Sequence, residues 1–325
     1  MRYVIGVDGG QTNTTAVVAD ETGCLLGIGQ GGPANHIHEP GGPERVQRSL
    51  KDAIHGALAM ADLENARIAA TCLGMTGSSE TMREICTPMV PSQQILFGHD
   101  TKIALYSVTF GRPGVVVIGG TGAAAYGLTE AGSEGWAGGW GYLLGDEGSG
   151  YWIALRALNA CCRATDGLMS PSLLLPLILQ HLEVSSLQEV HHKVYSGSLS
   201  RPDIAALSSV VGRAASQGDA TALRILREAG KELGQIVNAV IKKLHLQQTP
   251  VTVGAVGGVF RAGRFVLRTF RETVKETVPN VQIASPRVPA AVGAALMALE
   301  EIGIPLDDEQ LGRIHVTLPH LGPVK

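Results

Sequence analysis

Residues 2–20, RYVIGVDGGQTNTTAVVAD, decide how the N-terminal part of the chain folds. Two apolar runs, 2–8 and 14–20, flank a turn that contains two adjacent glycines, a pattern typical of a β-hairpin. Residues 23–30 supply a third strand after a second short turn of sequence ETG. We therefore expect the chain to begin with consecutive strands joined by tight turns.

The same pattern returns at residues 114–128, GVVVIGGTGAAAYGL. Two apolar strands again meet at a Gly-Gly turn that carries a threonine. We interpret the two stretches as a weak internal repeat with one hydrophobic core in each half. The length of 325 residues is suited to about two domains.

The remaining pattern alternates strands and helices, with more helix in the second half. The expected strands lie at 67–73, near 94–98, at 251–256 and at 281–284. The expected helices lie at 43–62, near 79–87, near 101–109, and at about 147–164, 172–182, 186–195, 203–217, 219–245, 260–278 and 289–302. The proline-containing tail, 304–325, is expected to be an irregular surface strap.

Composition and charge limit the functions to be considered. Hydrophobic residues make up 45% of the chain and charged residues 17%, with a net charge of −3 and no basic tract, so nucleic acids and anionic membranes are poor partners. No window offers about 18 uncharged apolar residues, and the N-terminus enters a strand without a signal-peptide pattern. Five cysteines, in a spacing that fits neither disulfides nor zinc, suggest free thiols in a cytoplasmic protein.

Two glycine turns are candidate phosphate-binding elements. In 8-DGGQTNT-14, glycine lets backbone amides approach phosphate oxygens, and a carboxylate at the strand end can hold hydrated Mg²⁺. The alternative is an ordinary polar hairpin. The second turn, 119-GGTG-122, stands at the matching place of the other half. The candidate cofactor-binding residues of these turns are Asp8, Gly9, Gly10, Gln11, Thr12, Gly120, Thr121 and Gly122.

Two further motifs follow strands. In 257-GGVFRAG-263, a strand, two glycines and a helix can lie against a nucleotide base or ribose, with Gly257 and Gly258 as candidates; the motif lacks the spacing of a dinucleotide site and the Lys-Ser/Thr of a P-loop. In 98-GHDTK-102, Asp100 either caps a helix or acts as a general base in phosphoryl transfer.

The segment 136-WAGGWGYLLGDEGSGYW-152 contains all three tryptophans of the chain. Together with DGGQTNT, GHDTK and GGTG, it resembles the N-acetylglucosamine kinase branch of the sugar kinase–heat-shock protein–actin superfamily. More broadly, the chain resembles the BadF/BadG/BcrA/BcrD ATPase family, which groups such kinases with activator ATPases of benzoyl-CoA reductase and 2-hydroxyacyl-CoA dehydratase. The resemblance runs from about residue 3 to residue 302.

The resemblance implies an α/β fold of two actin-like (ribonuclease H-like) domains with mixed central sheets and an ATP cleft between them. The expected N-terminal domain, on the sugar and phosphate side, comprises residues 1–110 and 288–325. The expected C-terminal domain, on the nucleotide side, comprises residues 111–287 and is rich in helices. The resemblance also implies ATP and Mg²⁺ as cofactors and a homodimer as the assembly.

The resemblance also implies roles for single residues. Asp8 would hold Mg²⁺ through water, and Asp100 would deprotonate the sugar 6-hydroxyl. Gly10 to Thr12, and Thr121 with its flanking glycines, would bind phosphates, while Gly258 falls in the adenosine loop. The expected sugar-side residues are Asn35, Thr76, Asp100, Gly139, Trp140, Gly141 and Asp146.

Several positions in these motifs have other readings or depart from the family pattern. Trp136 and Trp152 are expected to serve packing, and Glu147 to cap a helix N-terminus. Ala123 stands where the family often has serine, and Gly258 where a eukaryotic kinase has serine. A phosphate or ribose hydrogen bond is then lost or supplied by water.

The function expected from these observations is ATP-dependent phosphorylation of the 6-hydroxyl of an amino sugar, with N-acetylglucosamine as the first candidate. Glucosamine and a broad range of hexoses are alternative substrates. An activator-type ATPase would hold an iron–sulfur cluster through cysteines, but Cys161 and Cys162 are adjacent on one expected helix, where their side chains diverge by about 100°. A non-catalytic sugar sensor is the third alternative.

Overall fold

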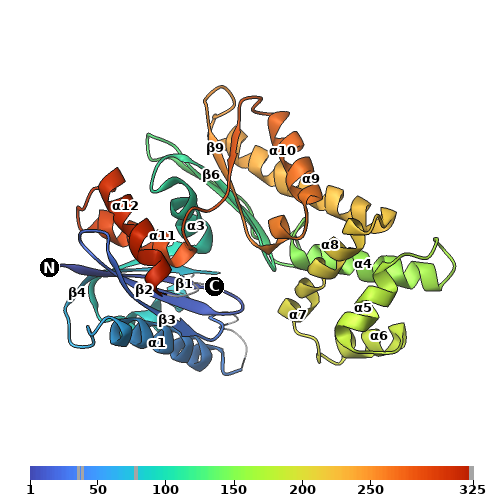
Figure 1. Ribbon diagram of the computed structural model, residues 1–325, viewed down its shortest axis with the longest axis horizontal. Coiled ribbons are helices and arrows are strands. Elements are labelled where there is room, and N and C mark those ends of the chain that lie inside the picture. The colour runs from blue at the N-terminus through green and yellow to red at the C-terminus, as the bar shows by residue number, and fades with distance from the viewer. Residues whose placement is uncertain (35–36, 38–39, 77–79, 322–325) are drawn as a thin grey trace. The chain divides into compact units, whose positions relative to one another are not determined.

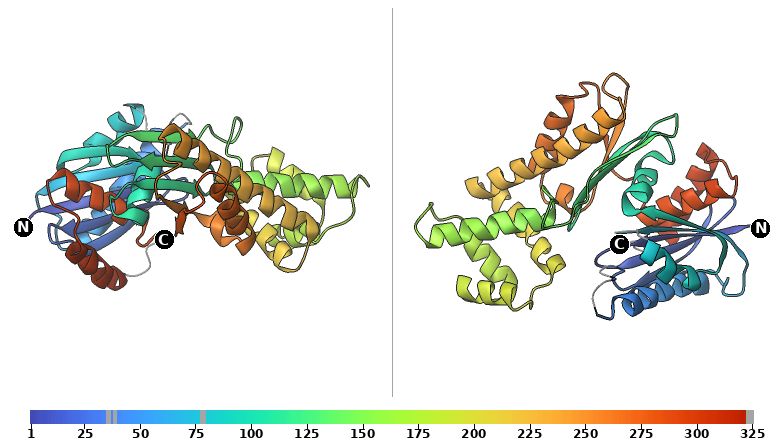
Figure 2. Two further views of the ribbon diagram at one scale, coloured as in Figure 1. Left: turned by 90° about the horizontal axis from the view of Figure 1, so that it is seen from above. Right: turned by 180° about the vertical axis from the view of Figure 1, so that it is seen from behind.

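The computed structural model describes residues 1–325 apart from 35–36, 38–39, 77–79 and 322–325. The chain forms two compact units. Unit 1 comprises Met1–Arg112 together with Pro286–Lys325, and unit 2 comprises Pro113–Ser285. Figures 1 and 2 show a central sheet with helices in each unit.

Unit 1 is built on a five-stranded sheet of order β3-β2-β1-β4-β5. The first three strands are antiparallel neighbours, whereas β1, β4 and β5 run parallel. The strands are β1 (Tyr3–Gly9), β2 (Thr14–Asp20), β3 (Leu25–Gly31), β4 (Ile68–Met75) and β5 (Ser92–His99). The N-terminal hairpins expected from the sequence are confirmed.

Helices cover both faces of this sheet, so its central strands are apolar on both sides. Val4 belongs to the core on the side of α11, whereas the next residue, Ile5, belongs to the core on the side of α1. Gly6 lets β1 approach α11 closely, because a Cβ there would lie 2.2 Å from the carbonyl oxygen of Ala291. The helices of unit 1 are α1 (Gly42–Met60), α2 (Glu80–Cys86), α3 (Asp100–Thr109), α11 (Ala290–Glu301) and α12 (Asp308–Thr317), with 3₁₀ turns η1 (Thr87–Met89) and η3 (Leu318–Leu321).

Unit 2 repeats the strand order of unit 1. Its sheet has the order β10-β9-β6-β7-β8, in which β6, β7 and β8 are antiparallel and β6, β9 and β10 are parallel. The strands are β6 (Gly114–Gly119), β7 (Ala123–Leu128), β8 (Glu134–Gly138), β9 (Thr252–Val256) and β10 (Gln282–Ala284). The internal repeat expected from the sequence is thus present in the topology, with β6 in the place of β1.

Strand β8 was not expected from the sequence. Residues 134–138 read EGWAG, whose two glycines lower the local β-propensity. The segment becomes a strand because it pairs with β7, and Trp136 packs on Tyr126 with the ring centroids 5.2 Å apart. It takes the place in unit 2 that β3 takes in unit 1.

The helices of unit 2 bury one continuous core, in which α9 packs on the sheet and α10 packs on α9. Two expected helices are interrupted: 203–217 divides at Leu207 into α7 and α8, and 260–278 begins as a 3₁₀ turn. The helical segments are α4 (Gly150–Thr165), α5 (Leu174–Leu182), α6 (Leu187–Tyr195), α7 (Arg201–Ala206), α8 (Ser208–Ser216), α9 (Ala220–Lys243), η2 (Gly258–Arg261) and α10 (Arg264–Lys275).

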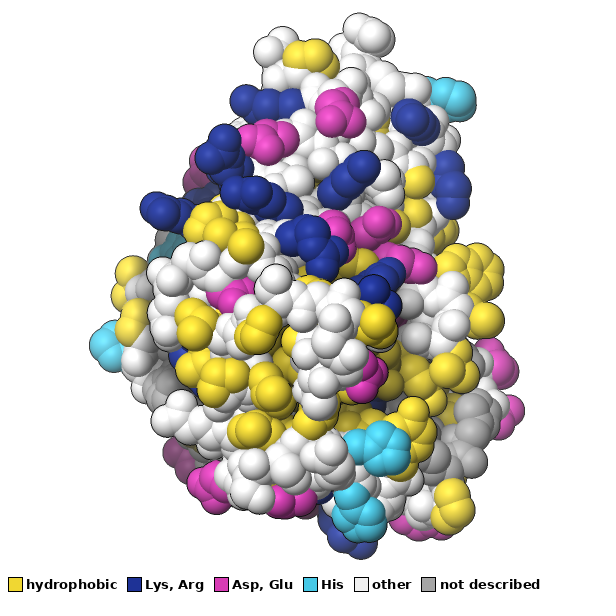
Figure 3. All heavy atoms as spheres, turned by 90° about the vertical axis from the view of Figure 1, so that its right-hand side faces the viewer, with side chains coloured by type: hydrophobic (Ala, Val, Ile, Leu, Met, Phe, Trp, Pro, Cys, Tyr) yellow, Lys and Arg dark blue, Asp and Glu magenta, His cyan; other side chains and the backbone are white. Residues whose placement is uncertain are grey.

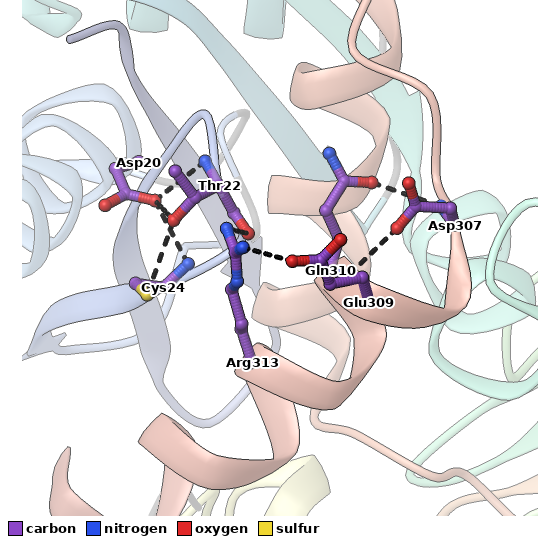
Figure 4. A network of polar contacts seen from close by, with 7 residues as sticks. All are labelled: Asp20, Thr22, Cys24, Asp307, Glu309, Gln310 and Arg313. Carbon is purple, nitrogen blue, oxygen red and sulfur yellow. Dashed lines mark hydrogen bonds and ion pairs between the residues drawn. The ribbon is translucent and has the colours of Figure 1, made fainter.

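The expectation of an irregular C-terminal tail is wrong, because residues 308–317 form α12. Asp307 and Gln310 form a capping box at its start. Figure 4 shows how the helix meets the turn between β2 and β3: Arg313 donates to the carbonyl of Thr22 at 3.2 Å and also pairs with Glu309. The tail therefore completes unit 1 by covering the tip of a hairpin.

Acidic and basic side chains are interspersed on the face of the molecule drawn in Figure 3, and apolar side chains gather on its lower part. This is the side that carries α5 and α6. In the part of the chain that the structure describes, no helix combines the length and the apolar character needed to cross a membrane.

Candidate active site

Three parallel strands of unit 1 bring Asp8, Thr76 and Asp100 to one edge of the sheet. Asp8 lies near the end of β1, Thr76 follows β4 directly, and Asp100 follows β5 directly. The register pairs Asp8 with Gly74, and Met75 with His99. Because parallel strands end at the same edge, these three residues converge although they are far apart in the sequence.

Asp100 is the first residue of α3, and His99 occupies the N-cap position without a side-chain hydrogen bond. The hydroxyl of Thr76 donates to Oδ2 of Asp100 at 3.0 Å. The backbone N–H of Thr76 in turn donates to the carbonyl of Gly9 at 3.1 Å. Thr76 therefore connects the first glycine turn to the Asp100 carboxyl group.

Burial raises the pKa of Asp100, while the hydrogen bonds from Thr76 and from the Thr101 backbone and the nearby His99 lower it. Burial, and secondly the charge of Asp100, raises the pKa of Asp8 to about 7. The two carboxyl groups therefore repel each other when both are ionised. A carboxylate with raised proton affinity is suited to accepting a hydroxyl proton.

The turn between β1 and β2 is held by backbone hydrogen bonds. Gly10 donates to the carbonyl of Asn13 at 3.0 Å, and Ala34 donates to the carbonyl of Gly10 at 3.0 Å. Gly9 packs closely on Met75, because a Cβ on Gly9 would lie 2.4 Å from the Met75 sulfur and the methionine side chain would have to move. Thr12 is exposed at the tip. The expected phosphate-binding residues thus lie on a fixed turn beside Asp8.

The second glycine turn, residues 119–123 of unit 2, contacts the tryptophan–glycine segment. Gly120 donates to the carbonyl of Gly122 at 3.0 Å within the turn. Gly139 donates to the carbonyl of Ala123 at 2.9 Å, and the carboxyl group of Asp146 accepts the N–H of Ala123 at 3.0 Å. The structure therefore brings Thr121 and its neighbours together with Gly139 and Asp146.

The loop after β8 exposes Trp140 and buries Asp146. Trp140 is 75% exposed, between two glycines with positive φ, Gly139 and Gly141. Asp146 is only 6% exposed. An exposed indole on a backbone of glycines can present an apolar surface to a ligand.

The other two tryptophans serve packing, as expected. Trp136 lies on Tyr126, and Trp152 packs in α4 with the guanidinium of Arg156 4.9 Å from the centre of its ring. Glu147 does not cap α4, contrary to expectation. Ser149 is the N-cap residue, and its hydroxyl accepts the N–H of Trp152 at 3.2 Å.

The turn at Gly257 and Gly258 lies against the second glycine turn, because β6 and β9 are neighbours in the sheet. A Cβ on Gly257, whose φ is 107°, would lie 2.4 Å from the carbonyl oxygen of Gly119. Gly258 then begins η2. The expected adenosine loop and the expected phosphate turn of unit 2 are thus side by side.

Sequence reasoning missed Arg201 and Tyr142. The guanidinium of Arg201 lies 5.2 Å from the centre of the Tyr142 ring, and its charge lowers the pKa of Asp146. The only local signal was the Ser200–Asp203 capping box, which starts α7 but does not show what α7 approaches. Asn35, the expected sugar ligand, lies outside the described residues.

Among the residues that the structure describes, no three His, Cys, Asp or Glu side chains are grouped as metal ligands. Cys161 is buried and Cys162 is exposed, and all five cysteines are free.

The fold and the residues gathered at its strand ends define an α/β protein with two mixed five-stranded sheets, the architecture of actin-like sugar kinases. The chain belongs to the BadF/BadG/BcrA/BcrD ATPase family, whose model matches residues 5–298. This membership confirms the resemblance seen in the motifs.

Two curated relatives match along nearly their whole length. The N-acetylmuramic acid/N-acetylglucosamine kinase of Clostridium acetobutylicum is 32% identical, with 93% of this chain and 99% of the relative aligned. The N-acetyl-D-glucosamine kinase of Dictyostelium discoideum is 29% identical, with 91% and 97% aligned. Among solved structures, a candidate N-acetylglucosamine kinase from Chromobacterium violaceum is 27% identical with a TM-score of 0.74, covering 92% of this chain and 99% of that one.

Proposed function

We propose that the protein transfers the γ-phosphoryl group of ATP to the 6-hydroxyl of an amino sugar, with N-acetylglucosamine as the first candidate. The observation that carries the proposal is the Asp100 carboxyl group at the carboxyl edge of β1, β4 and β5, held by Thr76 and close enough to Asp8 to raise its pKa. The names of the two curated relatives support the sugar class.

In this proposal Asp100 is the general base. Its carboxylate accepts the proton of the sugar 6-hydroxyl as the oxygen attacks the γ-phosphorus. The new bond joins that oxygen to phosphorus, the bond from phosphorus to the β–γ bridging oxygen breaks, and ADP leaves with the electron pair. The hydrogen bond from Thr76 keeps the carboxylate oriented.

The glycine turns would bind the nucleotide. The N–H groups of Gly10 and Gly120 hold the two turns by donating to Asn13 and Gly122. The amides that would donate to β- and γ-phosphate oxygens are those of Thr12 in unit 1 and of Thr121 and Gly122 in unit 2. Gly257 and Gly258 lie beside the second turn, which supports their assignment to the adenosine part of the nucleotide.

The residues present also fit Mg²⁺. Asp8 supplies a hard oxygen ligand. Its pKa of about 7 reflects burial first and the neighbouring charge of Asp100 second. Asp8 would hold the ion through water, and the ion would neutralise phosphate charge. The Thr12 and Thr121 hydroxyls would complete the phosphate contacts.

The proposed sugar-side residues are Asn35, Thr76, Gly139, Trp140, Gly141 and Asp146. The exposed indole of Trp140 suits the C–H face of a pyranose ring. The neighbouring glycines allow backbone groups to reach ring hydroxyls, and Oδ2 of Asp146 remains for one of them, since Oδ1 accepts from Ala123.

We also propose a cytoplasmic homodimer. Free cysteines fit a reducing compartment where ATP is available. Exposed Leu155, Leu168, Leu173 and Tyr195 of unit 2 supply apolar area for self-association. Sedimentation velocity tests the dimer, and a monomer at micromolar concentration would refute it.

The test of the proposed function is ADP release with Mg·ATP over a panel of N-acetylglucosamine, N-acetylmuramic acid, glucosamine and glucose. We expect ADP release to depend on an added amino sugar and the product to carry phosphate on O6. ADP release that is independent of every sugar, together with iron in the purified protein, would support the activator-type ATPase instead. Sugar binding without ADP release would support a sensor.

A further inference from the structure

Asp146 adopts a backbone conformation that side chains seldom take. Its φ is 62°, in the left-handed region, and the residue is 6% exposed. The left-handed region crowds the Cβ atom of a non-glycine residue, although aspartate tolerates it better than most. A buried carboxylate in such a conformation persists only where its surroundings compensate.

The compensation comes from the second glycine turn. Oδ1 of Asp146 accepts the N–H of Ala123 at 3.0 Å. The carboxyl group also lies against Gly122, where an added Cβ would stand 2.9 Å from Oδ2 and 3.0 Å from Oδ1. Asp146 therefore contacts the turn at the two residues that follow Thr121.

Three backbone hydrogen bonds join the same two segments on either side of Asp146. Gly139 donates to the carbonyl of Ala123 at 2.9 Å, Gly150 to that of Gly120 at 2.8 Å, and Tyr151 to that of Thr121 at 3.4 Å. Each residue from Gly120 to Ala123 except Gly122 thus has a hydrogen bond to the segment 139–151, and Gly122 has the carboxyl contact.

The pKa of Asp146 is raised above its ordinary value, chiefly by burial. Burial raises its pKa, whereas the Ala123 hydrogen bond and then the charge of Arg201 lower it, and Glu147 raises it again. Arg201 reaches this position from the first turn of α7, with its guanidinium 5.2 Å from the centre of the Tyr142 ring.

We propose that Asp146 is a positioning residue for nucleotide binding: its carboxyl group fixes the turn at 119–123 so that the amides of Thr121 and Gly122 face a phosphate. The inference rests on the proposed function, in which this turn binds ATP. It adds that the loop bearing Trp140 and the phosphate turn behave as one rigid element of unit 2, joined through Asp146.

Three substitutions separate the hydrogen bond from the backbone strain. Asp146→Asn keeps an acceptor and tolerates the left-handed conformation. Asp146→Gly removes the acceptor but relieves the strain, and Asp146→Ala removes the acceptor and keeps the strain. The matched control is Asp62, an exposed aspartate with φ 55°, changed to the same three residues.

The primary readout is calorimetric binding of Mg·ADP in the absence of sugar. We expect Asp146→Asn to bind within about 3-fold of the wild type, and Asp146→Gly to bind about 10-fold or more weakly, as for the loss of a charge-assisted hydrogen bond. Asp146→Ala should bind no better than Asp146→Gly, and the Asp62 variants should be unchanged. Equal Mg·ADP affinity in wild type and Asp146→Gly would overturn the inference and leave Asp146 a sugar contact only.

Hydrogen exchange of the Ala123 amide is the second readout, and it needs no nucleotide. We expect strong protection in the wild type and Asp146→Asn, and faster exchange in Asp146→Gly. If wild-type protein fails to bind Mg·ADP, the proposed function fails, while exchange still tests the contact. If Asp146→Gly does not fold, fast exchange of Ala123 in wild-type protein would by itself overturn the inference.

Discussion

The proton affinity of Asp100 is set by opposing influences. Burial disfavours the carboxylate, and the hydrogen bond from Thr76 favours it. Because the proposed base works only when ionised, the Thr76 hydroxyl should extend activity toward lower pH.

Thr76→Val removes this hydrogen bond at nearly constant volume and keeps the backbone hydrogen bond to Gly9. The pKa of Asp100 then rises further, so the acid limb of the pH profile of kcat/KM moves to higher pH. We expect a loss of roughly 10- to 100-fold at the acidic end of the profile and little loss at its alkaline end, given about 1.5–3 kcal/mol for a hydrogen bond to a charged group. Thr76→Ser should restore the wild-type profile. A uniform loss at all pH values would show that Thr76 does not act through Asp100.

The raised pKa of Asp8 makes the free energy of unfolding depend on pH. Its folded pKa of about 7 exceeds the ordinary value of 3.8, so between these values the folded protein holds a proton that the unfolded chain has released. Stability from this group therefore falls as pH rises from about 4 to about 7 and is constant above. The free-energy difference between Asp8→Asn and wild type, without Mg²⁺, should grow in favour of the variant by up to roughly 4 kcal/mol between about pH 4 and pH 8.

Denaturant titrations of unit 1 unfolding at several pH values measure this difference. The exposed Asp52 provides the control, since Asp52→Asn should stay parallel to wild type at every pH. Parallel curves for Asp8→Asn as well would mean that Asp8 ionises normally in the folded protein.

At the same scale, the sequence predicted the position of Asp100 but not its partners. A carboxylate just after a strand is visible in the letters GHD, because strand ends are marked by glycine and by a change of periodicity. The hydrogen bond with Thr76 depends on the register of β4 and β5, and the approach of Arg201 to Asp146 depends on helix packing. Neither contact can be predicted from the residues next to it in the sequence.

Among the elements, α12 is a helix that the proline content of the tail did not lead us to expect. Prolines at 305, 319 and 323 suggested an irregular tail, but a capping box at Asp307 and Gln310 and the buried pair Leu311 and Ile314 define a helix between them. The capping box was a readable signal. Strand β8 offered no such signal, because pairing with β7 decides it.

Gly23 tests the docking of α12 on the turn between β2 and β3. Its φ is 86°, and a Cβ would lie 2.9 Å from the carbonyl oxygen of Gln310. Gly303 has φ 77° and nothing within 4 Å of its Cβ position, so Gly303→Ala measures the conformational cost alone. We expect about 1 kcal/mol of destabilisation for Gly303→Ala and roughly 1–3 kcal/mol more for Gly23→Ala, from chemical denaturation. Equal destabilisation by Gly23→Ala and Gly303→Ala would show that α12 can move away from the turn at no energetic cost.

At the scale of the whole molecule, the fold was largely readable because it is built twice. Each unit starts with an antiparallel hairpin around a Gly-Gly turn and adds parallel strands on the other side of its first strand. The similar sequence patterns at residues 3–18 and 114–128 predicted this repeated hairpin. The repeat does not predict the helices from α4 to α8, which distinguish unit 2 from unit 1.

Transfer of a proton from a sugar hydroxyl to Asp100 is the central step of the proposed reaction, and one comparison tests it most directly. Turnover of N-acetylglucosamine with Mg·ATP is measured for wild type, Asp100→Asn and the surface control Asp52→Asn, alongside sugar binding by calorimetry. We predict that Asp100→Asn loses about 10²–10⁴-fold in kcat while sugar binding is partly retained, and that Asp52→Asn matches wild type. Unchanged turnover in Asp100→Asn would contradict the account.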